Sequence, residues 1–210
     1  FQNSLDDLFN IVQDLSTNPE SITNRELFIS QLDGFIEQAT NVYQALRDYQ
    51  VNLNSQIEEQ VKSINKIADQ IAQLNLQIAK VESSHLENAN DLRDKRNLLL
   101  DQLANYIPFD YYEEPNAMIT VRVNNAPLVQ DTIAYHMTTE RIEAKVATGG
   151  VFSTTEQTEM LKVVWEKSGF GDVFDIRKAY NSDDESDRGS LLGILTARGT
   201  KYGYYTDIPK

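Results

Sequence analysis

Histidine is the side chain best suited to acid–base catalysis at neutral pH, and this sequence contains only two, His85 and His136. Neither has a partner at a metal-binding or catalytic spacing such as HExxH, and no nucleophilic serine motif lies near either one. We expect His85 in a turn between helices and His136 on a strand. The sequence therefore predicts a protein that is not an enzyme, with no catalytic residues, no cofactor and no metal ion.

Two other stretches have some features of ligand-binding loops. The run Asp183–Asp187 alternates carboxylates that could meet calcium, but Arg188 and Ile194 stand where an EF-hand requires glycine and glutamate. The pair Gly149-Gly150 lacks the further glycines and the lysine of a phosphate-binding loop. We interpret the acidic run as a solvated loop. The absence of cysteine also excludes disulfides, thiolate metal sites and a cysteine nucleophile.

The charge balance limits the classes of partner. Among 210 residues, 32 acidic and 19 basic side chains give a net charge of −13. Such a surface repels nucleic acid phosphates and anionic lipid, so we expect no nucleic acid partner. No run of about 18 continuous apolar residues is present, so we expect no membrane insertion.

The elements that would position any functional residue are dominated by one long apolar repeat. Between Ile29 and Val81 apolar residues recur every seven positions, without proline and with one glycine. One row is Ile29, Ile36, Tyr43, Gln50, Ile57, Ile64, Ile71 and Ile78, and the row three residues on is Leu32, Ala39, Leu46, Leu53, Gln60, Ile67, Leu74 and Val81. A repeat of this length predicts a single coiled-coil-like helix, roughly 80–90 Å long, with one apolar seam.

The fold class expected from the whole chain is α+β: an elongated helical bundle with one very long helix and a smaller β-rich domain. Helices are expected at about 4–15, 23–82 and 89–106, which together make a helical domain over residues 1–107. After Pro108 the pattern changes to β-branched, alternating sequence, which predicts a β-rich domain over residues 108–188. Residues 189–210 are expected to begin a helix that returns towards the bundle.

The seam is longer than the two short helices can cover. Helices of about 12 and 18 residues reach only the two ends of the long helix, which leaves roughly 40 Å open in the middle. The open stretch is centred on the candidate partner-binding residues Tyr43, Leu46, Leu53 and Ile57. Three covers are possible: further segments of a longer protein, a second copy, or the returning final helix.

Three motifs resemble one known family. Residues 9–21 (FNIVQDLSTNPES), residues 61–78 (VKSINKIADQIAQLNLQI) and the run from Asn90 to Arg96 resemble the flagellar hook-associated protein 1 family, the FlgK hook-filament junction proteins. Residues 189–198 are similar to the segment with which that family returns from its β domain. The resemblance implies a central fragment that lacks both termini.

What the resemblance implies about function is structural. It implies a secreted, extracellular component of the bacterial flagellum that takes part in flagellum assembly and motility by joining hook to filament. The implied partners are other flagellar axial proteins (hook protein and the second junction protein), copies of itself in a ring, and an export chaperone that binds the missing segments. The alternative is a homodimeric coiled-coil scaffold or a cell-surface binding module.

Overall fold

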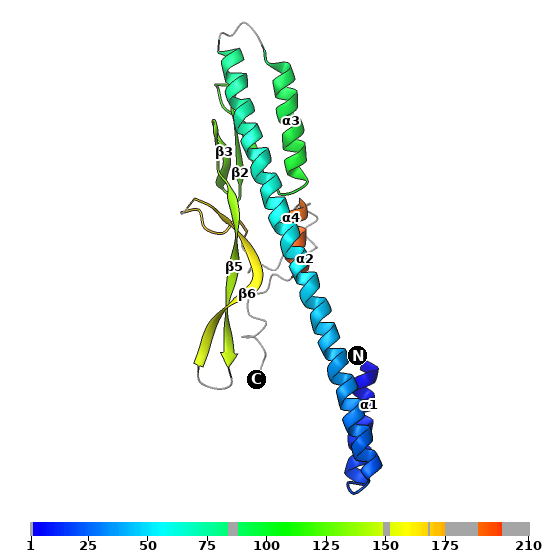
Figure 1. The fold of residues 1–210 in the computed structure, drawn as a ribbon. Helices are drawn as coiled ribbons and strands as arrows, with labels where there is room; N and C mark the ends of the chain where they lie inside the picture. The colour runs from blue at the N-terminus through cyan, green and yellow to red at the C-terminus, as the bar shows by residue number, and fades with distance from the viewer. Residues whose placement is uncertain (1, 84–87, 149–151, 168, 175–188, 199–210) are drawn as a thin grey trace. The chain divides into compact units, whose positions relative to one another are not determined.

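The chain folds as an α+β protein with one very long helix, as the sequence predicts, and its computed structural model is shown in Figure 1. The structure describes residues 2–83, 88–148, 152–167, 169–174 and 189–198. His85, Gly149-Gly150, the acidic run 183–187 and residues 199–210 therefore lie outside the described residues. The elements in chain order are α1 (Gln2–Thr17), α2 (Ile22–Glu82), α3 (Asn90–Ala104), β1 (Asp110–Glu113), β2 (Ile119–Val123), β3 (Ala126–Gln130), β4 (Ile133–Ala134), β5 (Met137–Thr148), β6 (Phe152–Trp165) and α4 (Gly189–Arg198).

The contacts of the chain divide it into two units, residues 1–51 and residues 52–210. The first unit holds α1 and the first part of α2, and the second holds the rest of α2 with every other element. The sequence-based division into residues 1–107, 108–188 and 189–210 concerns which segments fold independently, and it stays a prediction.

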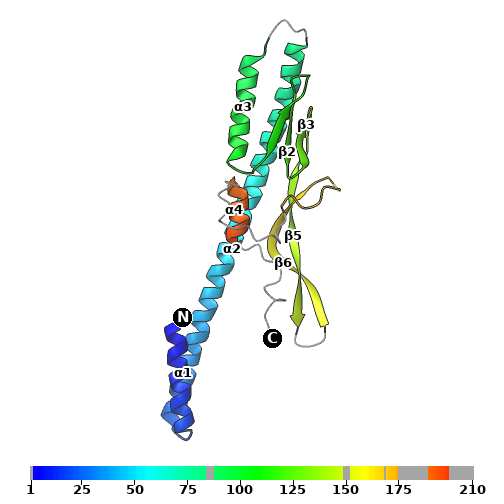
Figure 2. The same ribbon diagram turned by 180° about the vertical axis from the view of Figure 1, so that it is seen from behind.

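The first unit is a helical hairpin, in which α1 lies beside the first turns of α2 in both Figure 1 and Figure 2. Helix α2 begins at Ile22 because the hydroxyl of Ser21 accepts a hydrogen bond from the backbone N–H of Asn24, at 3.3 Å. This is an N-cap contact, which satisfies one of the free N–H groups of the first helical turn. The start expected at about residue 23 is thus one residue late.

The second unit has a single hydrophobic core. The apolar row of α2 is fully buried at Ile57, Ile64, Ile71 and Ile78. The first three of these side chains join one cluster with Leu103 of α3 and with the buried residues of the sheets and of α4. Because α2 contributes a residue to this core every seven positions, the repeat read from the sequence is the helical side of the core.

Two antiparallel sheets complete the second unit. The four-stranded sheet has the order β1-β2-β3-β4. Its β2–β3 turn places Asn124 and Asn125 at φ of 48° and 68°, a left-handed pair that tightens a two-residue hairpin. Strand β1 was not predicted, because its four residues are all exposed and show no alternation.

The other sheet is a long two-stranded ribbon of β5 and β6, paired from Met137 opposite Trp165 to Thr148 opposite Phe152. Residues 153–155 are rich in Ser and Thr, yet they pair with β5. The expectation that His136 lies on a strand is wrong, because it lies immediately before β5. Trp165, at the start of the pairing, is buried in the core.

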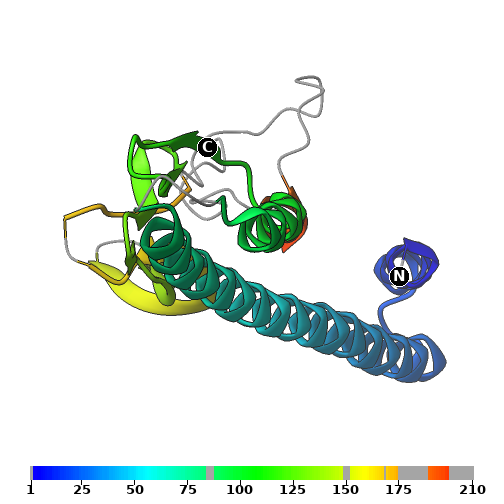
Figure 3. The same cartoon turned by 90° about the horizontal axis from the view of Figure 1, so that it is seen from above.

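Helix α4 is joined end to end with α3. The backbone N–H groups of Ser190 and Leu191 donate to the carbonyl oxygens of Asn105 and Tyr106, at 2.9 and 3.0 Å. The first free N–H groups of α4 thereby satisfy carbonyls at the end of α3. Seen from above in Figure 3, α4 lies almost directly beneath α3. The returning helix that the sequence predicts at residue 189 is present.

Candidate partner-binding surface

The two apolar rows of α2 differ in exposure between the two units. From Leu53 onwards the rows are mostly buried, whereas before it they are open: Tyr43 is 63% exposed and Leu46 is 64% exposed. Ile29 and Ile36, earlier in the same rows, are also more than half exposed. We call Ile29, Ile36, Tyr43 and Leu46 the open seam. None of the described residues before Leu53 is buried.

The four candidate partner-binding residues therefore divide into two pairs. Tyr43 and Leu46 lack cover, as expected, but the expectation of an uncovered surface is wrong for Leu53 and Ile57, which are 6% and 0% exposed. Ile57 belongs to the core cluster that also contains Leu191 and Leu195 of α4. The hydroxyl of Ser190 donates to Gln60 Oε1 at 3.2 Å, which sets α4 beside this part of α2. Of the three covers considered, the returning helix is thus found beside this stretch of α2, in the same core cluster as Ile57.

Within the first unit, α1 covers only one face of α2. Leu8, Ile11 and Leu15 of α1 are half-buried, and so are Phe28 and Leu32 of α2. The Ser4 hydroxyl donates to the Gln38 side chain, so the first turn of α1 lies level with Gln38. Every residue of α2 from Asn41 to Tyr49 is exposed. The part of the open seam at Tyr43 and Leu46 thus lies beyond the end of α1.

Two asparagines of α2 hold the sheets against the helix. Asn65 donates to the carbonyl of Met137 at 2.8 Å and accepts from its N–H at 2.9 Å. Asn75 donates to the carbonyls of Ile119 and Asp131, at 2.8 and 2.6 Å, and accepts from the N–H of Ile119 at 3.1 Å. Each amide thus pairs with a strand as another strand would. Asn65 and Asn75 both lie in the run 61–78 that resembles the family, but no pattern in the sequence predicts their contacts.

Arg96 of α3 completes the Asn75 contact. Its Nη1 group donates to Asn75 Oδ1 at 3.1 Å and to the Ala117 carbonyl at 2.8 Å, while the side chain is almost fully buried. Burial lowers the pKa of Arg96, because the charged guanidinium loses hydration, although nearby Glu113 opposes this. A buried polar network of this kind fixes one arrangement of the elements that meet there.

An ion pair joins the last residue of α2 to α3. Glu82 accepts from Arg93 Nε and Nη2 at 2.7 and 2.6 Å, and from the backbone N–H of Ala89 at 2.9 Å. The Arg93 hydrogen bond and then the Ala89 N–H lower the pKa of Glu82 from its ordinary 4.5 to about 2. The same hydrogen bond raises the pKa of Arg93.

The remaining polar side chains show no arrangement for catalysis within the described ranges. His136 Nε2 lies 2.9 Å from Asp69 Oδ1, and its Nδ1 lies 3.7 Å from Glu166 Oε2, but all three side chains are substantially exposed. A polar pocket between α3 and β1 is lined by Arg93 and Arg96, whose charges face Glu82 and Glu113 already. In the part of the chain that the structure describes, no three His, Asp or Glu side chains gather as metal ligands. None of the described helices is both long and apolar enough to cross a membrane.

The fold and this surface define a structural module built on one very long helix, with a seam closed along one half and open along the other. The chain belongs to the family described as the flagellar hook-associated protein FlgK helical domain, whose model matches residues 1–207.

Individual relatives agree with this membership. The chain is 27% identical over 197 residues to flagellar hook-associated protein 1 of Salmonella typhimurium LT2, covering 93% of this chain and 32% of the relative. It is 26% identical over 209 residues to the protein of the same name from Bacillus subtilis 168, covering 96% and 38%. The chain thus spans about one third of the length of these curated relatives.

A solved structure shares the fold. The flagellar hook junction protein FlgK from Burkholderia pseudomallei matches with a TM-score of 0.68 at 22% identity, over 94% of this chain and 32% of that one.

Proposed function

We propose that this chain is the helical part of a structural component of the bacterial flagellum, which joins hook to filament by subunit packing and mechanical coupling. Its family and the printed names of its relatives, flagellar hook-associated protein 1, support this proposal. The observation that carries it is the open seam, because exposed Ile and Leu side chains at helical spacing gain stability when another element covers them. Burying each such side chain is worth about 1.5–3 kcal/mol.

The covering elements follow from the size of the relatives. Since the relatives are about three times as long as this chain, we place their remaining segments on the open seam, with Tyr43 and Leu46 as the central contacts. Beyond these, the proposed partners are the hook protein, the second junction protein and copies of the same protein in the assembled ring. An export chaperone would act through segments outside this chain. The proposed location is extracellular, on the flagellum.

Mechanical coupling has a physical basis in the second unit. A long helix held to its sheets by the amides of Asn65 and Asn75, and by a continuous core, resists sliding because many contacts must break together. A force applied along α2 is therefore passed to the sheets without local deformation.

The test is a charge placed on the seam of the full-length protein. Leu46→Asp should reduce the number of cells with filaments attached to their hooks at least tenfold, as counted by electron microscopy, because the partner helix would have to bury a carboxylate. The matched control is Gln44→Asp, which adds the same charge to another exposed face of α2 and should leave filaments normal. Far-ultraviolet circular dichroism of both purified variants should be unchanged. Normal filaments on Leu46→Asp cells would overturn the proposal.

The alternative, a homodimeric coiled-coil scaffold or cell-surface binding module, is not favoured by the family. It makes a distinct prediction, namely a stable dimer of this chain in sedimentation at micromolar concentration. We expect a monomer, because the seam of the first unit is bordered by acidic residues on every copy.

A further inference from the structure

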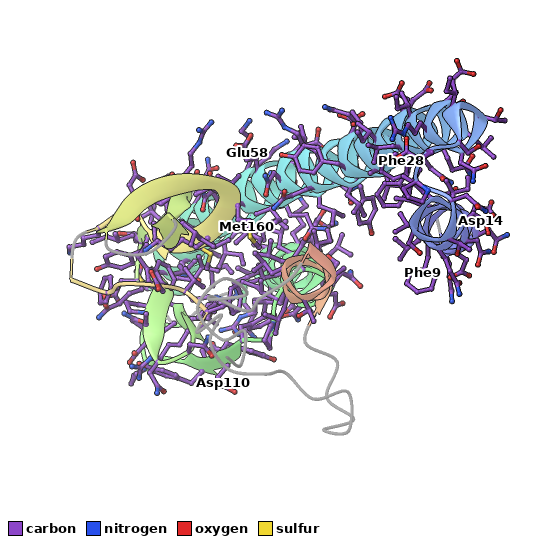
Figure 4. The ribbon with its side chains drawn as sticks, turned by 90° about the horizontal axis from the view of Figure 1, so that it is seen from below. Phe9, Asp14, Phe28, Glu58, Asp110 and Met160 are labelled. Carbon is purple, nitrogen blue, oxygen red and sulfur yellow. The ribbon has the colours of Figure 1, made fainter. Side chains whose placement is uncertain are left out.

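Helix α1 has more apolar surface than α2 covers. Leu8, Ile11 and Leu15 are half-buried, but Leu5, Phe9 and Val12 are exposed, with Phe9 at 69%. In Figure 4 the ring of Phe9 points away from α2. We call Leu5, Phe9 and Val12 the α1 stripe. The structure thus divides the apolar residues of α1 into two faces, one against α2 and one exposed.

The spacing of the α1 stripe is that of a helix-docking surface. Positions i, i+4 and i+7 lie in one row along two helical turns, which is the set of anchors with which one amphipathic helix contacts another. A single exposed apolar side chain is ordinary on a protein surface, but a row of three on one short helix is a contact surface.

The charges around the stripe limit the partner. The only charged residues of α1 are Asp6, Asp7 and Asp14, and none of them makes an ion pair in the described part of the chain. Residues 1–51 as a whole contain eight acidic and two basic side chains. A second copy of the same hairpin would bring like charges together, which is unfavourable, whereas a helix with lysine or arginine beside its apolar face would gain attraction.

We propose that the α1 stripe docks an amphipathic helix with basic flanks, supplied by a neighbouring protein of different sequence. This inference rests on the proposed function, since it gives the chemistry of one neighbour in the assembly. It concerns a surface separate from the open seam of α2, so the two can be tested independently.

The binding test uses full-length protein and two synthetic helical peptides with the same leucine seam, one flanked by lysine and the other by glutamate. Titration monitored by peptide fluorescence anisotropy should give an affinity at least about tenfold higher for the lysine peptide. Raising NaCl from 50 to 500 mM should weaken that binding by about tenfold, because salt screens exposed charges. Phe9→Ser should abolish binding, and the control Asn10→Ser, an exposed neighbour on another face, should not. Equal binding of both peptides, or unchanged binding by Phe9→Ser, would overturn the inference.

A labelling arm separates a neighbouring protein from other occupants. Because this chain has no cysteine, Phe9→Cys gives a single label site within it. Maleimide should react rapidly with this site in the purified full-length protein and slowly in isolated flagella. Slow reaction in the purified monomer would mean that the protein's own flanking segments hold the stripe, and fast reaction in flagella would mean that nothing does. Either result would refute the inference, and neither would touch the Leu46→Asp test of the proposed function.

Discussion

At the scale of single residues, the most informative polar side chains are those that hydrogen-bond to backbone groups at the ends of strands and helices. Asn65 and Asn75 stand on the buried face of α2, where a polar residue is costly unless every group is paired. Their short amides reach the exposed backbone groups of Met137 and Ile119, and both sides are satisfied. An Asn among isoleucines at heptad spacing is thus a signal of a polar contact inside the core, although the sequence does not say with what.

Glu82 gives the protein an acid-sensitive contact. Its pKa is about 2 in the folded protein and 4.5 ordinarily, so the ionised form is favoured by folding. The contribution of ionised Glu82 to the free energy of unfolding is therefore fully present above pH 4.5 and is lost as the pH falls towards 2. Glu82→Gln should therefore lower the free energy of unfolding at pH 7 by about 2 kcal/mol, allowing for the partial exposure of the pair.

The measurement is urea denaturation of wild type and Glu82→Gln at several values of pH. The difference between the two proteins should shrink steadily below pH 4.5 and nearly vanish by pH 2. A difference that stays constant over that range would show that the carboxylate charge contributes nothing to stability. Glu114→Gln, at a half-buried carboxylate with no ion pair among the described residues, serves as the control.

At the scale of elements, the cover of α2 depends on how α4 is attached to α3. Gly189 has a φ of +76°, a left-handed conformation that favours glycine, and a Cβ there would lie 2.4 Å from the carbonyl oxygen of Tyr106. The close approach is what allows Ser190 and Leu191 to reach the end of α3. Gly189 is therefore required for α4 to take its place over Ile57.

Gly189→Ala should release α4 and expose this part of α2. Hydrogen exchange followed by mass spectrometry should show at least about tenfold faster exchange in residues 189–198 and around Leu53 and Ile57. Gly193→Ala is the matched control, since nothing lies within 4 Å of its added Cβ. In the helix interior that change should stabilise by up to about 1 kcal/mol. Equal exchange in the two variants would show that the attachment at Gly189 does not hold α4.

At the scale of the whole molecule, the core belongs to residues 52–210 alone. The first buried residue of α2 is Leu53, and α1 has none. Removing residues 1–51 should therefore change the free energy of unfolding of the remainder by less than about 1 kcal/mol, particularly as Asn52 is a good N-cap residue for the shortened helix.

Trp165 makes this measurable, because it is the single tryptophan and is buried in the second unit. Urea titration followed by its fluorescence reports the unfolding of residues 52–210 in both the whole chain and the shortened one. A loss of several kcal/mol on truncation would mean that residues 1–51 support the core. The same assay applied to residues 108–188 alone would test the sequence-based division into domains.

Periodicity made the long helix, its neighbours and the change to strands after Pro108 predictable, because burial on one helical face leaves a seven-residue signature. The remaining features were not predictable, because they have no repeating pattern in the sequence. Strand β1 is wholly exposed and has no pattern, and the start of α2 at Ile22 depends on a contact of the Ser21 hydroxyl. The sequence was enough to predict that part of the apolar seam of α2 is exposed. It was not enough to predict that the exposed part ends before Leu53.

By itself the sequence determined that α2 has one long apolar seam, since the repeat runs from Ile29 to Val81 with only Gln50 and Gln60 as polar members. Only the tertiary structure decided where that seam is closed. Leu46 and Leu53 occupy equivalent positions in the repeat, and no local pattern distinguishes them, yet one is open and the other is buried. Leu53 lies in the part of α2 where the second unit begins, close to Gln60, which bonds Ser190 of α4 from 130 positions away, and such a long-range contact leaves no trace in the spacing of the seam.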